Sequence, residues 1–248
     1  MRSRVLILGG TGEARELALL LMNEGHDVIT SLAGRTTGPL LPAGRVRVGG
    51  FGGAEGLQRF IGAESIDVVA DATHPFAAQI SAHGHAAAQS CRIRYVRLER
   101  PAWRADEGDM WTLVKDASEA AAIILRDARV LLTIGRKEIA PFIKRHDLSG
   151  VIRMIEPLEH PLPARWTLLL ARPPFTPEQE RVLMCAHDIT VLVTKNAGGV
   201  KMASKLQAAR ELKISVVMIA RPPKPPAETA STPETLVKII SSGRHGHR

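Results

Sequence analysis

The fold is decided near the start of the chain by the stretch Val5-Leu6-Ile7-Leu8-Gly9-Gly10-Thr11-Gly12-Glu13. Four aliphatic residues in a row predict a buried strand, and the glycines after them predict a sharp turn. The Ala- and Leu-rich residues 13–23 then predict a helix. A strand, a glycine turn and a helix in this order bind dinucleotides, because the helix N-terminus attracts a pyrophosphate. The stretch therefore predicts a cofactor site at Gly10, Thr11, Gly12 and Glu13.

The end of the next predicted strand, over residues 27–32, indicates which dinucleotide is bound. No acid that could bond a ribose 2′-hydroxyl lies there, whereas Ser31 and Arg35 do. An arginine at this position accommodates the 2′-phosphate of NADP, so the residues favour NADPH over NADH. The G-x-G-x-x-G pattern is incomplete because Arg15 stands at its third glycine. A glycine turn without any ligand therefore stays open as an alternative.

Short aliphatic or β-branched runs alternate with longer Ala- and Leu-rich segments along the chain, which predicts βαβ units and mainly parallel sheets. The alternation stops after Leu98, and Pro101 cannot continue a central strand. We therefore expect an α/β protein with two tandem Rossmann-like, doubly wound domains, residues 1–98 and 99–248. The predicted strands span residues 5–8, 27–32, 45–48, 67–70, 94–98, 111–114, 129–134, 150–155, 189–194 and 215–219. The predicted helices span residues 13–23, 54–61, 76–90, 117–126, 177–187, 201–212 and 233–241.

Composition restricts the classes of partner. The 248 residues carry 33 Lys and Arg against 25 Asp and Glu, a net charge of +8 that favours an anionic partner. An aromatic content of 4% and the lack of a recognition module argue against nucleic acid. No run approaches the roughly 20 apolar residues of a membrane span, and two cysteines are too few for a disulfide scaffold. His83 and His85 would diverge on a helix, so no metal site is predicted. Because the sequence has few cysteines and no candidate membrane span, we expect a cytoplasmic protein. The oligomeric state is not indicated.

Polar residues follow several other predicted strands, at the edge where ligands of open α/β sheets bind. A second glycine cluster, residues 49–53, follows the third strand, and Thr73 and His74 follow the fourth. In the second half, cations stand beside predicted helix starts, where they would bind carboxylates but would not favour the helix dipole. Capping, packing or simple solvation stays the alternative for each. The cations and one neighbouring amide are Arg136, Lys137, Arg172, Lys195, Asn196 and Lys201.

Together these motifs resemble the precorrin-6A reductases of cobalamin biosynthesis over roughly residues 4–222. The resemblance implies NADPH-dependent reduction of the C18=C19 double bond of precorrin-6A, with hydride added to C19, to give precorrin-6B. It also implies two Rossmann-type lobes with an active site in the interdomain cleft. The segments that carry it are Gly9–Glu13, Asp71–Ala77, Arg100–Trp103, Gly135–Lys137, Thr194–Gly199 and Arg221–Pro222.

The resemblance also implies roles for single residues. Domain 1–98 would bind NADP, with the second glycine cluster on the nicotinamide side, and domain 99–248 would bind the polycarboxylate tetrapyrrole. His74 and Lys195 are the catalytic candidates, although water or a substrate group could supply the proton. The implied cofactor-binding residues are Gly10, Thr11, Gly12, Glu13, Ser31, Arg35, Gly50, Phe51, Gly52, Gly53 and Thr73. The implied substrate-binding residues are Arg136, Lys137, Arg172, Asn196 and Lys201.

Two other functions remain open on the residues alone. One is an NADPH-dependent reductase of another anionic substrate, and the other is a non-catalytic, NADP-binding regulatory protein. The sequence does not distinguish a metal-free from a cobalt-containing tetrapyrrole.

Overall fold

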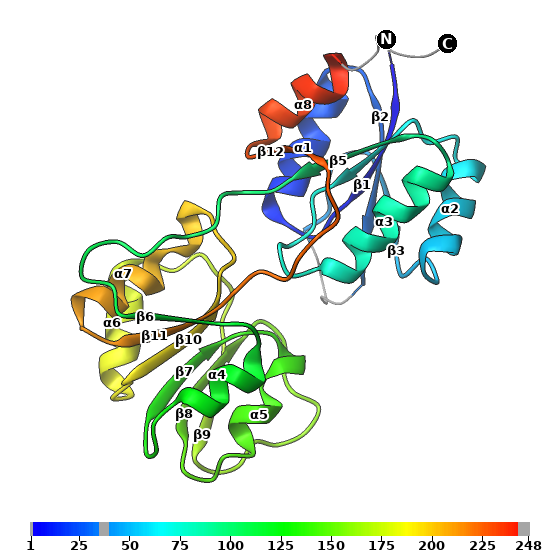
Figure 1. The fold of residues 1–248 in the computed structure, drawn as a ribbon. Coiled ribbons are helices and arrows are strands. Elements are labelled where there is room, and N and C mark those ends of the chain that lie inside the picture. The colour runs from blue at the N-terminus through cyan, green and yellow to red at the C-terminus, as the bar shows by residue number, and fades with distance from the viewer. Residues whose placement is uncertain (1, 35–39, 243–248) are drawn as a thin grey trace. The chain divides into compact units, whose positions relative to one another are not determined.

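The computed structural model describes residues 2–34 and 40–242, and the chain divides into two compact units (Figure 1). The first unit is formed by Met1–Pro101 together with Pro222–Arg248, and the second by Ala102–Arg221. Each unit holds one six-stranded parallel sheet with flanking helices, so the predicted α/β class is confirmed. The interdomain cleft stays a prediction. Among the described residues, no helix combines the length and the apolar character needed to cross a membrane.

In the first unit the strand order is β3-β2-β1-β4-β5-β12, the order of dinucleotide-binding sheets. The order reverses between β1 and β4, so the loops after these two strands leave the sheet on diverging paths. Helices α1 and α8 cover one face of the sheet, and α2 and α3 cover the other (Figure 1). The strands are β1 (Arg4–Leu8), β2 (Asp27–Leu32), β3 (Arg45–Val48), β4 (Val68–Asp71), β5 (Arg94–Leu98) and β12 (Glu228–Ala230). The helices are α1 (Gly12–Asn23), α2 (Ala54–Ala63), α3 (Ala78–Ser90) and α8 (Pro233–Ser242).

The second unit repeats this plan with the strand order β9-β8-β7-β10-β11-β6, which reverses between β7 and β10. Its strands are β6 (Trp111–Val114), β7 (Arg129–Thr133), β8 (Ser149–Met154), β9 (Trp166–Leu170), β10 (Val191–Lys195) and β11 (Ser215–Ile219). Its helices are α4 (Ala117–Ile123), α5 (Ala140–Ile143), α6 (Pro177–Ala186) and α7 (Ser204–Glu211). Two short 3₁₀ turns, η1 (Arg136–Glu138) and η2 (Val200–Met202), follow β7 and β10.

Strand β1 shows why these sequences form buried parallel strands. Val5 and Ile7 pack into the layer of α1 and α8, whereas Leu6 and Leu8 pack into the layer of α2 and α3. Successive side chains of a strand point to opposite faces, so a sheet covered on both sides needs an unbroken apolar run. The four residues are at most 1% exposed, as such a run predicts.

The C-terminal segment differs from the prediction, which placed all of residues 99–248 in the second domain. Residues 222–248 return to the first unit, where β12 pairs in parallel with β5. The pairing covers the β5 edge, and Leu236, Val237 and Ile240 of α8 add to the core beside α1. Conversely, β6, the strand that follows β5 along the chain, joins the second sheet beside β11. The two domains are therefore not strictly in tandem.

Candidate functional site

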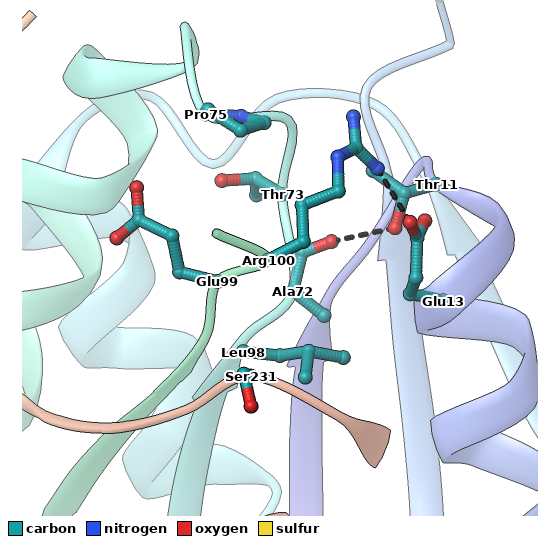
Figure 2. A pocket seen from close by; sticks show the side chains of 9 residues that line it. All are labelled: Thr11, Glu13, Ala72, Thr73, Pro75, Leu98, Glu99, Arg100 and Ser231. Atoms are coloured by element: carbon teal, nitrogen blue, oxygen red, sulfur yellow. Dashed lines mark hydrogen bonds and ion pairs between the residues drawn. The ribbon is translucent and has the colours of Figure 1, made fainter. Parts of the chain in front are cut away.

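The reversal point between β1 and β4 carries a small pocket at the carboxyl edge of the first sheet (Figure 2). Loops after β1, β4, β5 and β12 all contribute to it. Ligands of open α/β sheets bind at such reversal points, because diverging loops leave a crevice there. The lining residues are Thr11, Glu13, Ala72, Thr73, Pro75, Leu98, Glu99, Arg100 and Ser231.

The predicted glycine turn forms one wall of this crevice. Gly10 has a φ of +113°, which side-chain-bearing residues rarely adopt, and a Cβ there would meet nothing within 4 Å. Thr11 caps α1, since its hydroxyl accepts a hydrogen bond from the Ala14 backbone N–H at 3.0 Å. The same hydroxyl donates to the Ala72 carbonyl at 2.9 Å (Figure 2). Thr11 therefore fixes the loops after β1 and β4 to each other and leaves open space above Gly10.

Glu13 and Arg100 form an ion pair at the pocket, with 2.6 Å between Oε1 and Nη1 (Figure 2). Although partial burial opposes its charge, the pKa of the Glu13 carboxyl lies below its usual value, owing to its own backbone N–H and the Arg100 guanidinium. The sequence predicted Glu13 as a site residue but gave Arg100 no role. Its position directly after β5, at the same sheet edge, was the available signal.

Asp71 lies beneath the pocket and is fully buried at the end of β4. Its Oδ1 accepts from the Thr73 hydroxyl at 2.6 Å and from the Thr73 backbone N–H at 3.1 Å, and its Oδ2 accepts from the Tyr95 hydroxyl at 2.7 Å. Arg97 Nε and Lys224 Nζ approach Oδ2 to 3.7 and 3.9 Å. Burial opposes the charge of Asp71, but Lys224 and the neighbouring hydroxyls hold its pKa below the usual value. The sequence analysis missed this cluster, which fixes the orientation of the predicted residue Thr73.

His74 is exposed in the loop after β4, next to this cluster. Its Nδ1 accepts a hydrogen bond from the Phe76 backbone N–H at 3.2 Å. A ring nitrogen that accepts carries no proton, so the neutral imidazole holds its proton on Nε2. The Nε2–H is then the donor side of the ring.

The second glycine cluster follows β3, which is the edge strand opposite to β12 in the first sheet. Arg47 of β3 organises this loop, because it donates to the carbonyls of Gly49 and Gly50, both at 2.6 Å, and lies 3.9 Å over the Phe51 ring. Its Nη1 also lies 3.3 Å from the hydroxyl of Ser31, a predicted site residue. Gly52 and Gly53 complete the loop in conformations with positive φ, before α2 begins. The prediction for Arg35 falls outside the described residues.

The reversal point of the second sheet brings together the loops after β7 and β10. Lys195, the last residue of β10, forms an ion pair with Glu138. Glu138 Oε2 also accepts from the Gly135 backbone N–H at 3.2 Å, so one carboxylate fixes both the η1 turn and the lysine. Strand β10 has the position in the second sheet that β4 has in the first, so Lys195 corresponds to the residues at the end of β4.

Two of the other predicted substrate cations also have carboxylate neighbours. Arg136 lies 3.2 Å from Glu159, and Arg172 lies 3.9 Å from Glu156. Lys137 is exposed on η1. Lys201 lies in η2, and its side chain is outside the described part of the structure. The predicted cations therefore lie at the ends of three strands of the second sheet, β7, β9 and β10.

Asn196, predicted to bind the substrate, makes a structural contact within the second unit. Its Oδ1 accepts from the Trp103 backbone N–H at 2.8 Å, and its Nδ2 donates to the Trp103 carbonyl at 3.0 Å. One side-chain amide thus pairs with both backbone groups of Trp103, as a neighbouring strand would. Asn196 therefore joins the segment after Pro101 to the loop after β10. Among the described residues, no group of three or more His, Cys, Asp or Glu could hold a metal ion.

Comparison with known proteins gives one consistent family. Residues 4–241 match the family described as precorrin-6x reductase CbiJ/CobK. The precorrin-6A reductase of Rhodococcus erythropolis is 48% identical over 227 residues, which cover 91% of this chain and 92% of the relative. That of Rhodobacter capsulatus is 41% identical over 248 residues, covering 98% and 97%. The solved structure of CobK precorrin-6A reductase is 38% identical with a TM-score of 0.91, covering 97% of this chain and 96% of that one.

Proposed function

This chain belongs to the precorrin-6x reductase CbiJ/CobK family, and from that premise we propose that it reduces precorrin-6A to precorrin-6B with NADPH. The chain is an oxidoreductase, and the proposed reaction adds hydride to C19 and a proton to C18 of one double bond. The observation that carries the cofactor assignment is the glycine turn at the reversal between β1 and β4, where dinucleotides bind.

The residues at this turn fit a pyrophosphate. A Cβ on Gly10 would meet nothing within 4 Å, so a ligand can approach the backbone from that side. Helix α1 begins at Gly12, next to this space, and the positive end of its dipole would favour the negative charge of a phosphate there. Bound NADPH would supply the hydride. Gly10, Thr11 and Gly12 would hold its phosphates, and Arg100 would offset the charge that Glu13 places beside them.

The strand order divides the dinucleotide between two halves of the sheet. Strands β1 to β3 belong to the adenosine half, and β4 and β5 belong to the nicotinamide half. The pocket at Thr73 would therefore receive the nicotinamide. On this division the loop 49–53 would face the adenosine, whereas the resemblance implied that it supports the nicotinamide side.

Thr73 has a defined hydrogen-bonding role in this pocket. Its hydroxyl proton is committed to Asp71, so its oxygen has lone pairs available to accept a hydrogen bond. The nicotinamide carboxamide carries N–H donors, which such an acceptor would orient. Correct placement of the nicotinamide is the main catalytic contribution that a protein can make to hydride transfer.

The second unit would bind the substrate through its cations. Precorrin-6A is a polycarboxylate, and Lys and Arg side chains bind carboxylates by charge-assisted hydrogen bonds. Lys195, Arg136 and Arg172 each lie beside a protein carboxylate, which holds the cation in place until a substrate carboxylate joins or replaces it. Lys137, Lys201 and Asn196 stay predictions in this role.

The proton added at C18 has two proposed donors in this chain. His74 can donate from Nε2, and Lys195 can donate from its ammonium group. Water or a substrate group would replace them if neither side chain is needed. A Lys195→Ala variant that loses turnover or raises the substrate KM, with an unchanged Kd for NADPH, would support the placement of Lys195 at the substrate.

The proposed function is tested by mixing the protein anaerobically with NADPH and precorrin-6A. Coupled loss of nicotinamide absorbance and change of the tetrapyrrole spectrum would support the reductase. Binding of NADPH with neither change would refute the substrate and favour another anionic substrate or a regulatory role. Failure to bind NADPH at all would refute the cofactor.

A further inference from the structure

We propose that Arg47 is a specificity-determining residue that selects NADPH over NADH by binding the adenosine 2′-phosphate beside Ser31. The proposal rests on the NADPH dependence proposed above and assigns that preference to a residue of β3. Arg47 was no part of the sequence prediction, which relied on the residues after β2.

The register of β2 and β3 puts Arg47 at the required place. Arg47 is directly opposite Ser31 in the parallel pair, and each residue is the last but one of its strand. In dinucleotide-binding sheets, the side chain near the end of the second strand contacts the 2′-position of the adenosine ribose. The Nη1 of Arg47 lies 3.3 Å from the Ser31 hydroxyl, so both groups can bind one ligand there.

The guanidinium of Arg47 is already held in one orientation. It lies 3.9 Å over the Phe51 ring and donates to the carbonyls of Gly49 and Gly50. A side chain ordered before binding loses less entropy when the ligand arrives, which raises affinity. The loop that holds Arg47 is the glycine loop of the adenosine half.

Arg47 still has hydrogen-bonding capacity and charge for a ligand. A guanidinium has five N–H groups, and three hydrogen bonds use N–H groups of Nη1 and Nη2. The Nε–H and one Nη2–H make no hydrogen bond with the described residues. Arg45 of the same strand pairs with Glu64, whereas no described carboxylate forms an ion pair with Arg47. Within residues 2–34 and 40–242, the charge of Arg47 therefore has no carboxylate counterion, and the phosphate that NADPH carries and NADH lacks would provide its counter-charge.

The test compares dissociation constants measured by titration calorimetry, which needs no tetrapyrrole. Wild type, R47Q, R47K and R45Q are each titrated with NADPH, NADH and adenosine 2′,5′-bisphosphate. R47Q should weaken NADPH and the bisphosphate about tenfold or more relative to NADH, because a charge-assisted hydrogen bond is lost. R47K should keep part of the preference, since it retains the charge without the planar fork. R45Q is the matched control and should leave the ratio of the NADPH and NADH constants unchanged.

Equal weakening of NADPH and NADH by R47Q would overturn the proposal, because Arg47 would then only support the glycine loop. If R47Q does not fold, R47K carries the test, and an unchanged ratio in R47K would overturn the proposal as well. Wild-type protein that binds NADH as tightly as NADPH would refute the proposed cofactor itself. That failure is visible before any variant is measured and is therefore distinct from a failure of Arg47 alone.

Discussion

Thr11 joins the two loops at the reversal of the first sheet, so its hydroxyl offers a direct test of how the proposed cofactor site is held together. Replacing it by valine in T11V keeps the shape of the side chain and removes both hydrogen bonds. The Ala14 N–H loses its cap acceptor, and the buried Ala72 carbonyl loses its donor. The serine variant T11S keeps the hydroxyl and is the matched control.

The expected loss of stability follows from these two hydrogen bonds. Loss of an N-cap costs about 1 kcal/mol, and an unsatisfied carbonyl costs about 1–3 kcal/mol. Thr11 is only half-buried, so water can replace part of the second interaction. We therefore expect T11V to lower the free energy of unfolding by about 2 kcal/mol relative to T11S, and to weaken NADPH binding as the two loops separate.

Urea unfolding followed by far-ultraviolet circular dichroism measures this difference. All three tryptophans lie in the second unit, so their fluorescence reports whether that unit unfolds together with the first. If the free energies of unfolding of T11V and T11S differ by less than about 0.5 kcal/mol, the range of ordinary surface substitutions, the two hydrogen bonds of Thr11 do not stabilise the fold as expected. Unchanged NADPH affinity in T11V would separately show that the bond to Ala72 does not shape the site.

Three further predictions concern stability. Burial opposes the charge of Asp71, but nearby cations and hydroxyls lower its pKa in the folded protein. The charge of Asp71 therefore stabilises the fold above the unfolded pKa of about 3.9. This stabilisation disappears as the pH falls through the lower folded pKa. The advantage of wild type over D71N in thermal unfolding should shrink across this range, and a constant difference would contradict it. G150A should destabilise by about 3 kcal/mol or more, because Gly150 has a φ of +142° and its Cβ would lie 2.0 Å from the Val130 carbonyl oxygen; an unchanged urea midpoint would exclude this. N196A should destabilise by about 2 kcal/mol through the two backbone groups of Trp103, whereas a loss of substrate affinity at full stability would contradict this structural role and favour a substrate contact.

The glycine turn and the parallel sheets could be predicted because their signals are local. The run Val5–Leu8 is apolar on both faces, and Thr11 stands where a helix cap is needed. Neighbouring residues alone therefore determine this strand, turn and helix. Strand β12 escaped prediction because three residues, after a proline-rich segment, carry no periodic pattern. Its formation depends on the β5 edge, which lies far away in the sequence.

The site residues that escaped prediction depend on partners distant in the chain. Lys224 approaches Asp71 only because the C-terminal segment returns to the first sheet. The role proposed for Arg47 depends on the register that places it opposite Ser31, and strand register cannot be read from the sequence. The contact of Asn196 with the Trp103 backbone could not be predicted, because a polar residue at a strand end has the same pattern whether it binds a ligand or a backbone.

The return of β12 to the first sheet affects the order in which the two units can fold during translation. Residues 102–221 are contiguous, so the second unit can fold as soon as it has left the ribosome. The synthesis of the first unit begins earlier, yet this unit lacks β12, α8 and the pocket residue Ser231 until the second unit has been synthesised. The proposed nucleotide site is thus begun before the second unit and completed after it, and a chain truncated before β12 would lack a complete one.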